Sequence, residues 1–76
     1  MMFYHCFMDA KGYFFARRVR DENIPFEHKG VKLIKLEDDT PYDQVPSLLR
    51  QEFLKQKVGF TEPSIEKKID IVQFIN

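Results

Sequence analysis

The chain has 76 residues, and its 12 basic and 12 acidic side chains give a formal net charge of zero. A balanced charge provides no overall attraction to nucleic acid or to an anionic membrane, so either kind of binding would need a local cluster of charge. Apolar residues make up 43% of the chain, including eight Phe and three Tyr, which is enough for one α+β domain over residues 1–76.

Two similar turn sequences lie in the first half of the chain, at residues 9–12 (Asp-Ala-Lys-Gly) and 27–30 (Glu-His-Lys-Gly). A type I turn that ends in a left-handed glycine joins antiparallel strands through a bulge. The first turn separates two aromatic-rich runs, residues 3–9 and 13–20, which we predict to form a hairpin.

The first of these runs is apolar on both sides. In a strand, Phe3, His5 and Phe7 would share one face, and their neighbours Tyr4, Cys6 and Met8 would share the other. Apolar side chains on both faces are typical of a central strand. We therefore expect either a central strand or a strand whose second face is also covered.

The middle of the chain predicts a short extended segment and a strand. Residues 24–26 contain Pro25, which has no backbone N–H, so this segment would form an edge strand or only an approach to the turn. Residues 31–37 are predicted from their composition to form a full strand, with Val31, Leu33 and Lys35 on one face and Lys32, Ile34 and Leu36 on the other.

A helix is predicted next, because apolar residues at positions 45, 48, 49, 53 and 58 form one stripe. Thr40 followed by Pro41 resembles a helix start with a capping hydroxyl. Pro46 would disrupt a helix interior, so we predict a single turn near 41–44 and the main helix over about 46–57. Gly59 is suited to the position after the helix.

The last predicted strand covers residues 65–75. The element order is then β-β-(β)-β-α-β. We predict an antiparallel sheet of four to five strands with one α-helix packed on one face. The terminal strand and the Pro25 segment would be the exposed edges.

The sequence contains no motif for catalysis or for a cofactor. His5 and Cys6 are adjacent in a strand and would point to opposite faces, so they could not act on one metal ion or as a nucleophile–base pair. The acidic run 37–39 lacks the glycine and spacing of a calcium loop. We expect no enzymatic activity, no metal and no cofactor.

One cluster is suited to binding, because arginines follow aromatic residues on the second predicted strand and lysines lie on the next long strand. These candidate interface residues are Tyr13, Phe15, Arg17, Arg18, Arg20, Lys32 and Lys35. Arginine and aromatic residues are enriched at protein interfaces, and the same residue types stack on bases and hold phosphates.

From these features we expect a small non-enzymatic module that binds a protein partner, such as a modulator or inhibitor of the kind that phages and mobile elements encode. The alternatives are a homodimer that continues the sheet through its exposed strand edges, and a nucleic-acid-binding protein that uses the aromatic and arginine residues. A third alternative is that the arginines are only a solvated face of the strand. A single cysteine is typical of a reducing compartment. We find no signal peptide and no apolar run of about 20 residues that could cross a bilayer, so the expected location is the cytoplasm.

Overall fold

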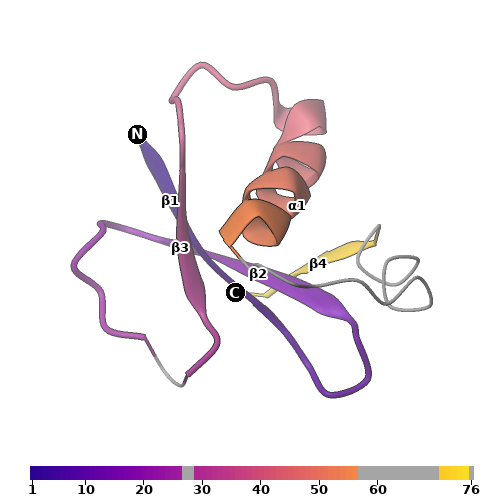
Figure 1. The fold of residues 1–76 in the computed structure, drawn as a ribbon. Coiled ribbons are helices and arrows are strands. Elements are labelled where there is room, and N and C mark those ends of the chain that lie inside the picture. Colours follow the sequence, from indigo (N-terminus) through magenta and orange to yellow (C-terminus); the bar gives the residue numbers. More distant parts are fainter. Residues whose placement is uncertain (27–28, 57–70, 76) are drawn as a thin grey trace.

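The computed structural model describes residues 1–26, 29–56 and 71–75. Its elements are β1 (Met2–Met8), β2 (Phe14–Val19), β3 (Lys32–Leu36), the 3-10 helix η1 (Tyr42–Gln44), α1 (Val45–Gln56) and β4 (Val72–Phe74). The strands form one sheet in the order β3-β1-β2-β4, and α1 lies across one face of it (Figure 1). The predicted α+β class is confirmed. Within the described residues, no helix is long and apolar enough to cross a membrane.

The first predicted turn joins β1 to β2 as an antiparallel hairpin. Gly12 has φ 91°, a left-handed conformation that glycine adopts without steric cost. Its N–H donates to the carbonyl of Asp9 at 3.0 Å, and the Asp9 carboxylate accepts from the N–H of Lys11 at 3.0 Å. In the second turn, Gly30 also has a left-handed φ of 89°, while residues 27–28 lie outside the described part.

The sheet is mixed, which corrects the prediction that all strands are antiparallel. β4 runs parallel to β2, with Phe14 opposite Val72, and the N–H of Ile75 donates to the carbonyl of Ala16 at 2.9 Å. Only residues 72–74 of the predicted strand 65–75 are assigned to β4, and residues 65–70 lie outside the described part.

One of the two predicted sheet edges, the terminal strand, is confirmed by β4, whereas the other edge is β3 and not the Pro25 segment. Residues 24–26 form no strand, because Pro25 has no N–H for a ladder. The edges of the described sheet are β3 and β4. At the β3 edge, the side-chain Nε2 of Gln56 at the end of α1 donates to the carbonyl of Leu33 at 3.2 Å.

The core lies between α1 and one face of the sheet. The even-numbered residues of β1 and β2 point to this face. Among them, Phe14 contacts Phe53 of α1 with ring centroids 4.9 Å apart. The buried cluster comprises Tyr4, Cys6, Phe14, Ala16, Ile34, Leu36, Val45, Leu49 and Phe53. The predicted helical stripe is therefore confirmed for positions 45, 49 and 53, which are buried, and position 58 lies outside the described part.

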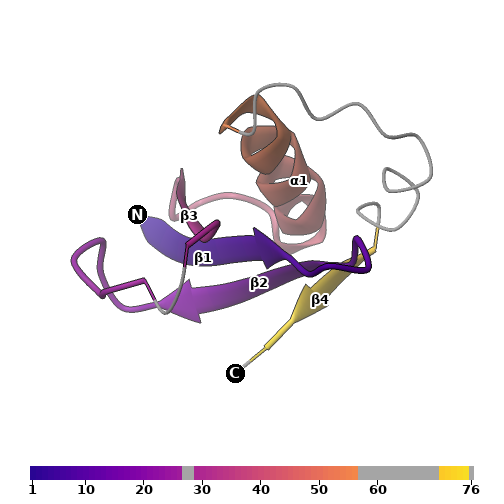
Figure 2. The same cartoon turned by 60° about the horizontal axis from the view of Figure 1, so that its bottom comes forward.

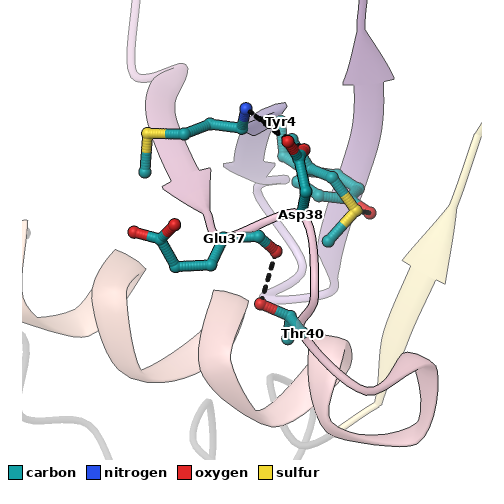
Figure 3. Close-up of polar contacts among 6 residues, drawn as sticks. Tyr4, Glu37, Asp38 and Thr40 are labelled. Atoms are coloured by element: carbon teal, nitrogen blue, oxygen red, sulfur yellow. Dashed lines mark hydrogen bonds and ion pairs between the residues drawn. The ribbon is translucent and has the colours of Figure 1, made fainter.

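The connection between β3 and α1 is held by local polar contacts (Figure 3). The Thr40 hydroxyl donates to the carbonyl of Glu37 at 2.6 Å, so it closes the turn after β3 and does not cap a helix as predicted. Residue 41 precedes η1, which has no side-chain cap. The ammonium group of Met1 lies 3.1 Å from the Asp38 carboxylate and thus brings the start of the chain to this turn.

The core contact between α1 and the hairpin yields a stability prediction. We expect Phe53→Ala to lower the free energy of unfolding by about 3–5 kcal/mol, which is comparable to the whole stability of a domain of this size. Urea unfolding followed by circular dichroism measures the change. Gln51→Ala, at an exposed position of the same helix, should shift it by less than about 0.5 kcal/mol. Equal unfolding midpoints for the two variants would contradict the described core.

Candidate functional site

The face of the sheet opposite α1 is apolar and aromatic. Figure 2 shows α1 on one side of β1 and β2, with no described helix on the other side. Because successive side chains of a strand point to opposite faces, the odd-numbered residues of the first three strands point to that other side. We name this surface the aromatic face and define it as Phe3, His5, Phe7, Phe15, Val19, Leu33 and Phe26.

Its rings contact one another across elements. Phe7 and Phe15 are stacked, with centroids 5.2 Å apart and an interplanar angle of 19°. His5 is buried, and the ring of Phe26 from the β2–β3 connection meets it edge-on at 4.8 Å. Phe26 is still 52% exposed, and both rings of the stack are partly exposed. The surface is therefore ordered by its own contacts and still accessible.

Basic side chains lie beside this face. Arg17 is directly opposite His5 in the β1–β2 register and is exposed. Lys35 of β3 forms an ion pair with Glu22 of the β2–β3 connection, with a nitrogen–oxygen distance of 2.6 Å. Glu22 therefore offsets the charge of Lys35 on this side of the sheet.

The structure divides the seven candidate residues between surfaces. Phe15, Arg17 and Lys35 lie on the side of the aromatic face, and Tyr13 belongs to the turn before β2, where its N–H donates to Asp9 at 2.9 Å. Arg18 and Lys32 occupy alternate strand positions and belong to the α1 side, and Arg20 follows the end of β2. Neighbouring strand residues point to opposite faces, but at the end of β2 the three arginines all border one hollow of about 230 Å³, together with Val19 and Ile24.

Arg18 and Arg20 border a depression of about 390 Å³ at the start of β1 and the end of β2. Its other lining residues are Met1, Met2, Phe3 and Val19. Within the part of the chain that the structure describes, neither arginine forms an ion pair or a hydrogen bond. Both side chains are exposed and available to an anionic group from outside.

Arg18 also lines a second hollow, of about 230 Å³, between the start of α1 and the sheet. We name it the tyrosine groove, and its lining residues are Tyr4, Arg18, Tyr42, Val45, Pro46, Phe74 and Ile75. Burial raises the pKa of Tyr4, and the positive charge of Arg18 acts in the opposite direction. The phenol and the guanidinium are therefore close enough to interact electrostatically.

Several of these surface residues were not among the sequence candidates. Phe3 and Phe7 could have been included, because alternation already placed them on one face with His5. Phe26 and Tyr42 follow prolines in connecting segments, and no periodic pattern predicts which way such side chains point. The exposed fraction of Tyr42 is 92%, a value that only the folded chain reveals.

Cys6 lies at the centre of the core, and its surroundings suppress thiol chemistry. The residue is fully buried, and burial raises the pKa of its thiol from 9.0 to about 12. A neutral thiol is a poor nucleophile. Within residues 1–26, 29–56 and 71–75, no group of three or more His, Cys, Asp or Glu side chains is arranged to hold a metal ion.

No protein-family model matches the chain, and no curated protein sequence or solved structure has significant similarity to it.

The burial of Cys6 predicts both its reactivity and a pH dependence of stability. The folded state holds the thiol proton up to a pKa of about 12, whereas an unperturbed thiol releases it near 9.0. This contribution to stability is complete below pH 9 and is lost as the pH rises toward 12. Urea unfolding across this range should therefore show a steeper loss for the natural chain than for Cys6→Ala.

Alkylation gives an independent measurement of the same burial. Below pH 9, iodoacetamide should modify Cys6 slowly in the folded protein and rapidly in urea, because alkylation needs an exposed thiolate. Equal rates in both conditions would contradict the placement of Cys6 in the core.

Proposed function

We propose that the protein is a small non-enzymatic module that binds a protein partner through the aromatic face. The observation that supports this proposal best is the combination of a stacked pair, Phe7 and Phe15, with the 52% exposed ring of Phe26 on a sheet face that no described helix covers. Such a module would modulate or inhibit a larger partner.

The composition of this face is suited to a protein interface. Hot spots in interfaces are enriched in aromatic and arginine residues that become desolvated on binding. The aromatic face has both types, since Arg17 lies beside its rings. Its rings already contact one another, so less side-chain entropy is lost when a partner covers them.

A nucleic-acid partner is the second candidate, and one contact favours it. The Phe7–Phe15 stack lies on the same face as Arg17, and stacked aromatic rings beside a cation are suited to bases and phosphates. Two facts make this candidate weaker. The chain has no net charge, and Glu22 pairs with Lys35 next to this face.

The protein-binding proposal is tested by changing the exposed rings. We expect Phe26→Ser or Phe15→Ser to weaken binding to a captured partner by about thirtyfold or more, the loss that is typical of a hot-spot residue. The partner is obtained by affinity capture from cells that express the protein naturally and is identified by mass spectrometry. Its affinity for each purified variant is then measured by calorimetry.

Two controls make this test specific. Gln51→Ser, at an exposed position of α1, should retain the natural affinity, and urea unfolding shows whether each variant is folded. Sedimentation identifies a second copy as the partner if the natural chain associates with itself and Phe26→Ser does not. A natural chain that is monomeric and captures no partner would contradict the proposal, as would a partner that binds Phe26→Ser with full affinity.

The nucleic-acid candidate makes a different prediction. Fluorescence anisotropy with a labelled single-stranded RNA or DNA should show affinity that decreases steeply as salt is added, because phosphate contacts release counterions. Arg17→Ala should weaken this binding further and reduce its salt dependence. The absence of binding at low salt would eliminate this candidate and leave the protein-binding proposal unchanged.

A further inference from the structure

We propose that the tyrosine groove is a second binding site, which takes a short segment of a partner protein in which an acidic residue adjoins a proline. In this arrangement, Arg18 holds the carboxylate, and the rings of Tyr42, Pro46 and Phe74 contact the adjacent proline. This site is separate from the aromatic face and does not depend on the function proposed for that face.

The groove is lined mainly by rings that come from distant parts of the chain. Tyr4 of β1 meets Phe74 of β4 edge-on, with ring centroids 6.4 Å apart. Tyr42 of η1 and Pro46 of α1 form the wall on the helix side. Grooves lined by aromatic residues receive proline-containing peptides, whose extended conformation is largely formed before binding.

The wall on the helix side is held in place before any ligand arrives. Tyr42 follows Pro41, and the carbonyl of Pro41 accepts a hydrogen bond from the N–H of Gln44 at 2.9 Å. The turn that precedes it is closed by a hydrogen bond that the Thr40 hydroxyl donates to the carbonyl of Glu37 (Figure 3). A fixed backbone limits the entropy cost of binding to that of the side chain itself, and the 92% exposed ring of Tyr42 is accessible to a partner.

The charge of the groove determines which partner it fits. Arg18 is the one ionic side chain among its lining residues. Within the described residues, the Arg18 guanidinium has no ion pair or hydrogen bond. A guanidinium is complementary to a carboxylate, which it can hold through two parallel hydrogen bonds. An acidic partner residue would therefore supply the negative charge that complements Arg18.

The size of the groove favours a peptide over a cofactor. Sites for drug-sized ligands and cofactors have volumes of about 300–1,000 Å³, whereas this groove has about 230 Å³. That space suits one or two side chains of a polypeptide that crosses the surface. Val45, which is 4% exposed, contributes an apolar part of the lining.

The two binding surfaces are distinguished by adjacent arginines on β2. Arg17 is opposite His5, which belongs to the aromatic face, whereas Arg18 is opposite Tyr4 of the core side. Arg18 lines the tyrosine groove and Arg17 does not, so a substitution of Arg17 is the matched control for a substitution of Arg18. This arrangement makes separate tests possible.

The experiment is a titration of isotopically labelled protein with two blocked peptides, followed by nuclear magnetic resonance. One peptide has a single aspartate between prolines, and the other has asparagine in its place. We expect the aspartate peptide to shift the signals of residues 18, 42–46 and 74–75. Its affinity should fall by about tenfold or more in Arg18→Gln or with the asparagine peptide, since each change removes a charge-assisted hydrogen bond.

Matched variants complete the test. Tyr42→Ala should also lower the affinity for the aspartate peptide. Lys55→Gln, which removes an exposed cation from the far end of α1, should leave that affinity unchanged. Equal losses in Arg17→Gln and Arg18→Gln would overturn the proposal, as would equal affinity for the two peptides or shifts confined to other residues. The absence of binding, or inorganic phosphate that displaces the peptide from Arg18, would overturn it as well. None of these results bears on binding through the aromatic face.

Discussion

The fold depends on how β1 is covered, because this central strand has apolar side chains on both faces. On one face, Tyr4 and Cys6 are buried against α1. On the other face, Phe3, His5 and Phe7 lie beside their strand neighbours, and the ring of Phe26 meets that of His5. Among the described residues there is one α-helix, and one helix can cover one face of a sheet. The aromatic face is a direct consequence of this constraint.

Strand alternation has the same effect on the charged residues of β2. Arg17 and Arg18 are adjacent in sequence, yet one belongs to the aromatic face and the other borders the tyrosine groove. The two guanidinium sites therefore differ in their surroundings, although both border one hollow with Arg20 near the end of β2. Each site has its own aromatic surroundings, so each can have its own ligand, and the zero net charge of the chain does not prevent either from binding.

Much of the local structure could be predicted from the sequence, because it depends on neighbouring residues. The turn at Gly12, the strand on either side of it and the apolar stripe of α1 each follow from short patterns. The pairing of β4 could not be predicted in this way. Its parallel position beside β2 depends on contacts such as that of Ile75 with Ala16, which are distant in the chain. The predicted capping role of Thr40 was wrong, because its hydroxyl donates to the carbonyl of Glu37 and η1 has no side-chain cap.

The tyrosine groove shows why a site can escape sequence analysis even when its residues are conspicuous. Tyr4, Arg18 and Phe74 lie in three strands, and Tyr42 lies in the 3-10 turn before α1. Only the sheet order brings these elements together, since β2 must lie between β1 and β4 for Tyr4 to meet Phe74. The same order buries the Tyr4 ring, while the preceding turn leaves that of Tyr42 exposed. The groove therefore combines a buried ring, that of Tyr4, with an exposed ring, that of Tyr42.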